Sequence, residues 1–199
     1  VYKRQELSKV LSDLHDFMLD IPNVPSDDTP VGDNESDNEV VKTHLEPKST
    51  HSKSHEEISK NINFELSQRL SGSRYSVLNG PIAKLHRVLV SFMIENAINN
   101  EYEEFYLPYI VNEEMLVGTG QLPKFEEDLF KLENGQFLIP TSEVPLTNLM
   151  RDKIILSTDL PLKFTSHTPC FRSEAGSYGK DTKGMIRLHQ FDKVELVQI

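Results

Sequence analysis

The chain has 199 residues, of which 37% are hydrophobic, so it has enough apolar material for a core. Its net charge is -10 at pH 7. This acidic balance argues against a protein that coats nucleic acid. Its single cysteine, Cys170, excludes an internal disulfide and is expected to be a small buried side chain in a reducing compartment. Because no stretch approaches the ~20 apolar residues of a membrane span and the first residues are too polar for a signal peptide, we expect a cytoplasmic protein without a membrane partner.

The first segment is predicted to be helical. Leu7, Val10 and Leu14 recur at the a and d spacings of a heptad. This spacing fits one amphipathic helix packed on a core as well as it fits a coiled coil. Pro22 ends the pattern, because a proline disfavours helical geometry at the residue before it. Residues 1–21 therefore form the first part of the chain.

A polar linker follows over residues 22–61. It is rich in proline, acidic residues, serine and histidine, which predicts little regular structure. Its histidines are His44, His51 and His55. They have no cysteine and no apolar shell nearby, so we interpret them as solvated side chains and expect no metal site.

The globular part is predicted to begin at residue 62 and to continue to residue 199. Pro81 opens a helix with one apolar face. A strand is predicted over residues 105–111, and Pro108 within it indicates a sheet edge or an interface. The apolar face of the helix comprises Ile82, Leu85, Leu89, Phe92 and Met93.

Turn signals divide the remainder into a loop, a hairpin, a helix and two long strands. The pair Asn134-Gly135 is a strong hairpin signal. These elements predict a mostly antiparallel sheet with helices, which is an α+β domain. The predicted ranges are 118–123 for the loop, 128–132 and 136–139 for the hairpin, 141–152 for the helix, and 162–174 and 190–199 for the strands.

The last two strands carry the candidate chemistry. Side chains two positions apart share a strand face, so Arg172 and Glu174 are expected to point together, as are Phe191 and Glu195. An arginine fork suits a phosphate, a ring face suits a nucleobase and a carboxylate accepts a hydrogen bond from an exocyclic amine. These side chains predict an ATP site, although a charged solvent face of a hairpin fits the spacing equally well. The connection between the strands adds Lys180, Lys183 and Arg187.

Two further segments are ambiguous from spacing alone. Residues 141–143 (TSE) fit a helix N-cap, and they also fit a hydroxyl and a carboxylate that grip a substrate ammonium group. Residues 118–125 (GTGQLPKF) form a glycine-containing loop. That loop lacks the ending of a P-loop and the full dinucleotide fingerprint, so alone it predicts only a turn.

Four motifs taken together resemble those of seryl-tRNA synthetases. The resemblance is weak in the linker and strong after residues 71–74. It implies a class II aminoacyl-tRNA synthetase fold, an antiparallel sheet flanked by helices. It also implies that the first helix is the end of a coiled-coil arm that binds tRNA. The motifs are residues 118–125 (GTGQLPKF), 141–148 (TSEVPLTN), 171–179 (FRSEAGSYG) and 186–195 (IRLHQFDKVE).

The resemblance also implies an activity and a set of site residues. The activity is activation of L-serine with ATP to seryl-adenylate and its transfer to tRNA(Ser), in a homodimer formed through the region around residues 81–111. Arg172 and Arg187 are then the catalytic residues, at the α-phosphate and the distal phosphates. The ATP-binding residues implied are Arg172, Ser173, Glu174, Arg187 and Phe191. The serine-binding residues implied are Thr141, Ser142, Glu143 and Glu195.

The sequence departs from the class II pattern in one respect. The third class II motif does not occur before Ile199, so Mg²⁺ is expected with its main ligands in that motif, and we expect the chain alone to be an inactive fragment. Two rival functions stay open. One is a ligase that charges a carrier protein instead of tRNA, and the other is a non-catalytic dimerising or regulatory module.

Overall fold

The structure is a computed structural model that describes residues 2–46, 53–175 and 183–199. The chain divides into two compact units, Val1–Ser52 and Lys53–Ile199. His51 and Lys180, which the sequence singled out, lie outside the described residues. Within those ranges, no helix is both long and apolar enough to cross a membrane.

The first unit contains the helix expected from the heptad spacing. This helix, α1, runs from Tyr2 to Leu19 and so ends two residues before the predicted Ile21. The apolar side chains of its heptad pattern are more than half exposed, as Leu7 (57%) and Phe17 (65%) show. A short 3-10 helix, η1 (Glu35–Asp37), follows, and the side chain of Asn34 caps it.

The second unit begins with four short elements. They are α2 (His55–Ile58), β1 (Ile62–Asn63), α3 (Phe64–Ser71) and β2 (Val77–Leu78), and β1 pairs with β2 in an antiparallel manner. Asn63 caps α3, because its side chain accepts a hydrogen bond from the Leu66 N–H. The helix α2 lies inside the segment predicted to have little regular structure, so that expectation was wrong for residues 55–58.

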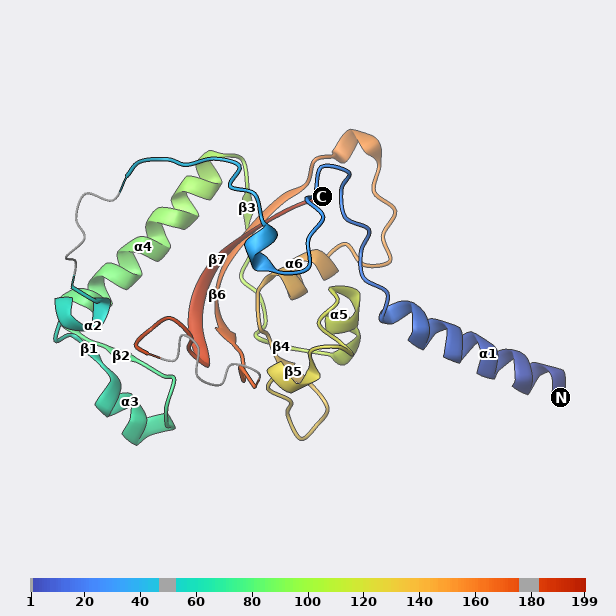
Figure 1. The fold of residues 1–199 in the computed structure, drawn as a ribbon, viewed down its shortest axis with the longest axis horizontal. Helices are drawn as coiled ribbons and strands as arrows, with labels where there is room; N and C mark the ends of the chain where they lie inside the picture. Colours follow the sequence, from blue (N-terminus) through green and yellow to red (C-terminus); the bar gives the residue numbers. More distant parts are fainter. Residues whose placement is uncertain (1, 47–52, 176–182) are drawn as a thin grey trace. The chain divides into compact units, whose positions relative to one another are not determined.

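Two long strands form the centre of the second unit. They are β6 (Lys163–Phe171) and β7 (Gln190–Gln198), paired antiparallel from Lys163↔Gln198 to Phe171↔Gln190. β3 (Glu103–Glu104) adds a parallel pairing to β6. The helix α4 (Gly80–Asn99) contacts β6 and β7 from one side, and α6 (Glu143–Asn148) contacts them from the other (Figure 1).

Each face of this pair of strands can be assigned from the register. Thr141, just before α6, contacts Glu195, while His86 of α4 contacts Asp192. Odd-numbered residues of β7 therefore face the α6 side and even-numbered residues face α4.

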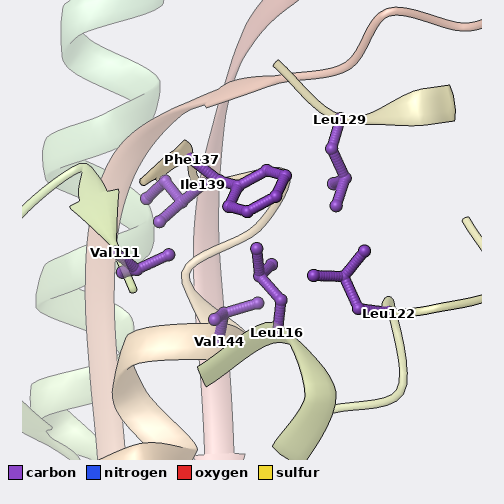
Figure 2. Close-up of a cluster of buried hydrophobic side chains, with 7 residues drawn as sticks. All are labelled: Val111, Leu116, Leu122, Leu129, Phe137, Ile139 and Val144. Atoms are coloured by element: carbon purple, nitrogen blue, oxygen red, sulfur yellow. The ribbon is translucent and has the colours of Figure 1, made fainter. Parts of the chain in front are cut away.

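A cluster of buried hydrophobic side chains packs beside α6. Here β4 (Ile110–Val111) pairs antiparallel with β5 (Phe137–Leu138), next to α5 (Glu113–Gly118). Phe137 is fully buried in the middle of the cluster, and removal of such a ring costs about 3–5 kcal/mol in comparable cores. The cluster anchors the segment that leads into Thr141 (Figure 2). Its residues are Val111, Leu116, Leu122, Leu129, Phe137, Ile139 and Val144.

Three predicted elements need correction. The strand expected over 105–111 is split, because the Phe105 N–H bonds to β6 at Thr165 whereas Tyr109 accepts from the Ile139 N–H. Pro108 between them has no N–H to donate, and the segment leaves one sheet for the other there. The helix expected over 141–152 is shorter, since α6 covers only Glu143–Asn148 and turns follow it.

The third correction concerns the end of β6. The strand stops at Phe171 rather than at Glu174, and Glu174 has a positive φ of 50°. Two 3-10 helices complete the described elements, η2 (Glu126–Asp128) and η3 (Ser157–Asp159). The hairpin expected at Asn134-Gly135 is present as a tight turn, with an isolated antiparallel bridge between Lys131 and Phe137 and a φ of +84° at Gly135.

Candidate active site

Arg172 is held between two elements just beyond the end of β6. Its N–H donates to the His189 carbonyl at 2.9 Å, which keeps its backbone beside the start of β7. Its Nε donates to the Pro140 carbonyl at 3.3 Å. The guanidinium lies 5.3 Å from the centre of the Phe191 ring, within the range of a cation–π contact. These contacts leave a positively charged group fixed beside an aromatic face.

Glu174 and Arg187 form an ion pair beside Arg172. Arg187 NH1 donates to Glu174 Oε2 at 3.0 Å, and the side chains are 44% and 14% exposed, respectively. The two residues come from opposite ends of the connection between β6 and β7. Arg172 and Glu174 line the same two cavities, although both lie beyond the end of β6 and not on one strand.

Thr141, Lys193 and Glu195 form a network at the α6 side of β7. Thr141 Oγ1 donates to Glu195 Oε2 at 2.7 Å. Lys193 Nζ lies 2.7 Å from the same carboxylate oxygen and 2.8 Å from Thr141 Oγ1. Phe191, Lys193 and Glu195 thus share one face of β7, as the strand period requires. The shared face of Phe191 and Glu195 was expected, whereas Lys193 was overlooked.

The strand beneath this network is closely packed. Opposite Phe191, Lys193 and Glu195 in the register stand Cys170, Thr168 and Ser166, all with no exposed surface. Burial raises the pKa of the Cys170 thiol and keeps it in the neutral form. Cys170 is therefore the small buried side chain that the sequence predicted.

The structure also places three other predicted site residues. Ser142 is fully buried and its Oγ has no hydrogen-bond partner among the described residues. Glu143 is exposed, and its N–H makes a long 3.4 Å hydrogen bond to Thr141 Oγ1. Ser173 donates its hydroxyl to the Glu127 carbonyl, so it anchors the loop.

Two cavities adjoin at Arg172, Glu174 and Arg187, which line both. The first, of about 290 Å³, is also lined by Thr141. The second, of about 330 Å³, is also lined by Phe191. Each volume is near the lower end of the range for small-molecule sites. Glu143 lines neither cavity among the described residues. The remaining lining residues of the first cavity are Gln121, Phe125, Asp128, Leu129 and Pro140.

The segment from Gln121 to Leu129 is another contribution that the sequence did not predict. Glycine spacing alone indicated only a turn at residues 118–125, but the turn is anchored in the core by Leu122 and Leu129. Asp128 also accepts from the Ala175 N–H at 3.0 Å and from the Ser173 N–H at 2.9 Å. This segment therefore forms the wall opposite Arg172.

The described residues offer no obvious metal centre. Within residues 2–46, 53–175 and 183–199, no group of three or more His, Cys, Asp or Glu side chains is arranged to hold a metal ion. His55, expected to be solvated, instead accepts a hydrogen bond from the Met185 N–H at 2.8 Å.

Comparison with known proteins shows the family of this chain. Residues 125–199 match the model of the tRNA synthetase class II core domain (G, H, P, S and T). The chain is 53% identical to the serine–tRNA ligase of Francisella philomiragia, over 97% of this chain and 49% of that protein. It is 50% identical to the serine–tRNA ligase of Teredinibacter turnerae, over 98% of this chain and 47% of that protein. The chain therefore spans about half the length of the curated relatives it matches.

Solved structures give the same result. Seryl-tRNA synthetase from Pyrococcus horikoshii, complexed with ATP, superposes with a TM-score of 0.85 at 29% identity, covering 97% of this chain and 49% of that one. Cytoplasmic serine–tRNA ligase from Naegleria fowleri, in complex with AMP, gives a TM-score of 0.85 at 27% identity, covering 98% and 48%.

The fold and these matches define a class II aminoacyl-tRNA synthetase core with α+β architecture. Within that class, the chain belongs to the seryl-tRNA synthetase family.

Proposed function

We propose that this chain supplies ATP- and serine-binding residues of a serine–tRNA ligase. The observation that carries the proposal is the continuity of the site. An arginine above an aromatic ring and an adjacent carboxylate–arginine pair line two adjoining cavities, and Thr141 joins the first cavity to the Glu195 carboxylate. That sequence of groups matches the order of nucleobase, phosphate and amino acid in an aminoacyl-adenylate.

The ATP end is assigned to the cavity beside Phe191. The Phe191 ring offers a stacking face, and the Glu174 carboxylate accepts a hydrogen bond from the adenine amino group. Arg172 is fixed by Pro140 and Phe191 before any ligand binds. It therefore stabilises charge on the α-phosphate with little reorganisation, which is the most effective form of electrostatic catalysis. Arg187 is half-exposed and reaches the distal phosphates, while Ser173 fixes the loop through Glu127.

The serine end is assigned to the segment before α6 and the far end of β7. Thr141 and Glu143 hold the serine ammonium group, and Ser142 packs beneath them as a fully buried hydroxyl. Glu195 accepts a hydrogen bond from the serine hydroxyl. Its carboxylate already accepts from Thr141, so its orientation is set in the free protein.

The reaction begins with in-line attack of the serine carboxylate oxygen on the α-phosphate of ATP. The bond from the α-phosphorus to the pyrophosphate leaving group breaks, which gives seryl-adenylate and pyrophosphate. The terminal ribose hydroxyl of tRNA(Ser) then attacks the activated carbonyl, and AMP leaves. Positioning and charge stabilisation are sufficient for both steps, so no side chain acts as a covalent nucleophile.

Other parts of the chain receive roles by the same proposal. Residues 1–21 are the end of the tRNA-binding arm, residues 22–61 a linker, and residues 62–199 the part of the catalytic domain with class II motifs 1 and 2. Mg²⁺ is proposed to act with ATP through ligands outside the described residues. We also propose a homodimer that works in the cytoplasm, like the ligase described as cytoplasmic from Naegleria fowleri.

The deciding experiment is pyrophosphate exchange by the native protein that contains this chain. Exchange is expected with ATP and L-serine, and much more slowly with alanine, glycine or threonine. A second assay supplies tRNA or a carrier protein as the acceptor of labelled serine. Transfer to tRNA supports the proposal, transfer to the carrier protein favours the rival ligase, and no exchange with any amino acid would favour a non-catalytic module.

A further inference from the structure

Lys193 lies at the serine end of the site without any role assigned by sequence motif. Its side chain projects from β7 between Phe191 and Glu195, on the face that carries both. Its Nζ is 2.8 Å from Thr141 Oγ1 and 2.7 Å from Glu195 Oε2. In the ligand-free protein, the Lys193 ammonium is thus held by two side chains that the proposed function assigns to serine.

The Lys193 ammonium and the serine ammonium are chemically alike. Each is a compact cation with three N–H donors and no acceptor. Thr141 is 4% exposed and the Glu195 side chain 21% exposed, so few approaches to them remain open. Two ammonium groups at one threonine hydroxyl would also repel each other. Serine and Lys193 therefore compete for the same contacts.

We propose that serine binds by exchange with Lys193 and that the released Lys193 ammonium pairs with the substrate carboxylate. The inference rests on the proposed function and adds a specificity residue to it. The serine ammonium takes over the Thr141 contact, and the serine hydroxyl takes over the Glu195 contact. Lys193 keeps these groups oriented until the substrate arrives.

The charge balance decides which ligands this exchange accepts. Lys193 and Glu195 carry one charge of each sign in the free protein. Serine adds one cation and one carboxylate, so the net charge at the site stays zero and the displaced Lys193 gains a carboxylate partner. An amine without a carboxylate, such as ethanolamine, would leave the displaced Lys193 without one. Lys193 therefore selects an amino acid over a simple amine, because an unpaired charge in a partly buried site is costly.

Lys163 provides a matched lysine outside the site. It stands on β6, its Nζ is 3.1 Å from Glu101, and its side chain is 24% exposed, compared with 30% for Lys193. Both lysines pair with a glutamate and both come from the same pair of strands. They differ in that only Lys193 contacts Thr141 among the described residues.

The test measures the KM of L-serine and the inhibition constant of ethanolamine in pyrophosphate exchange by the native protein. The preference for serine is the inhibition constant of ethanolamine divided by the KM of L-serine. Lys193→Met is expected to lower this ratio by about tenfold or more, because one charge-assisted contact is lost. Lys193→Arg retains a cation and is expected to keep most of the preference. Lys163→Met is expected to leave it unchanged.

The outcomes separate this inference from the proposed function. If the unmodified protein shows no serine-dependent exchange, the proposed function fails. If exchange is normal but the preference is the same in Lys193→Met as in the unmodified protein, Lys193 does not select the carboxylate and the inference is overturned. A thermal melt checks folding, and Lys193→Gln replaces Lys193→Met if the latter does not fold.

Discussion

The guanidinium of Arg172 lies 5.3 Å from the centre of the Phe191 ring, and both groups line one cavity with Glu174. In the proposed function, this pair joins the phosphate-binding group to the nucleobase platform. Its geometry depends on the Pro140 carbonyl, which accepts from Arg172 Nε at 3.3 Å. The Arg172 guanidinium is therefore held in place by a backbone carbonyl as well as by a side chain.

Replacement of Arg172 is expected to affect adenylate formation more than replacement of another arginine. Arg172→Ala in the native protein should lower pyrophosphate exchange by about 10²–10³-fold, the loss typical of one preorganised donor, ~2.7–4 kcal/mol. Arg151 is the control, because it also bonds a backbone carbonyl, that of Glu114, but lines neither cavity. Equal, small losses in Arg172→Ala and Arg151→Ala would show that the phosphate assignment is wrong.

Much of this site could be predicted from strand periodicity. The period of two placed Phe191 and Glu195 on one face of β7, and the register bears this out. The same rule also places Lys193 there, but a lysine between two assigned residues gave no separate signal. The pattern failed at Glu174, because β6 ends at Phe171 and Glu174 has a positive φ of 50°, and the surrounding sequence indicates neither feature.

Pairing partners explain the other failure. The segment from Phe105 to Val111 reads as one strand because its apolar residues are close together. Its two halves bond to different partners, Thr165 for Phe105 and Ile139 for Tyr109. Pro108 marked a break, but a local pattern cannot say which strand lies on each side of it. Long-range pairing, rather than propensity, decides this part of the fold.

The exposed apolar face of α4 leads to a prediction about assembly. Leu85 and Phe92 are 50% and 67% exposed, although both lie on the apolar stripe of the helix. An exposed apolar stripe on a helix indicates that another protein surface packs against it. The native protein is expected to sediment as a dimer at micromolar concentration. The Phe92→Glu variant is expected to shift toward the monomer, and the Phe92→Leu variant is expected to remain a dimer. A monomeric native protein would contradict the proposed homodimer.

Gly184 is predicted to secure the end of the loop against α2. It has a φ of +68°, and a Cβ added there would clash with His55 Nε2. His55 accepts from the Met185 N–H at 2.8 Å, so Gly184→Ala must disturb this contact. The amide of Met185 is expected to exchange with solvent deuterium about tenfold faster in that variant, which corresponds to the loss of one hydrogen bond.

Gly135→Ala is the control for this backbone effect. Gly135 also has a positive φ, of +84°, but no atom lies within 4 Å of its added Cβ. Both variants carry the cost of a left-handed alanine, roughly 1–2 kcal/mol. Met185 exchange should be unchanged in Gly135→Ala. If the two variants changed Met185 exchange alike, backbone strain rather than the His55 contact would be responsible.

The last prediction concerns the choice between serine and alanine, which differ by one hydroxyl. An apolar pocket discriminates weakly between such ligands, whereas a site built to bond the hydroxyl rejects the ligand that lacks it by ~10⁴ or more in favourable cases. Glu195 is the proposed partner, held by Thr141 at 2.7 Å and by Lys193 at 2.7 Å. Glu195→Ala should lower serine activation strongly and alanine activation much less, narrowing the ratio by about 10²-fold or more.

The structure also supports a competing role for Glu195, because its ion pair with Lys193 could serve only to stabilise β7. Glu195→Gln separates the two roles, since an amide loses the charge but keeps an oxygen that accepts from a hydroxyl. The Glu195→Gln variant is expected to keep a higher ratio of serine to alanine activation than the Glu195→Ala variant. Pyrophosphate exchange with each amino acid gives the ratio, and a thermal melt reports folding. A well-folded Glu195→Ala protein with the original serine-to-alanine ratio would show that Glu195 does not read the hydroxyl.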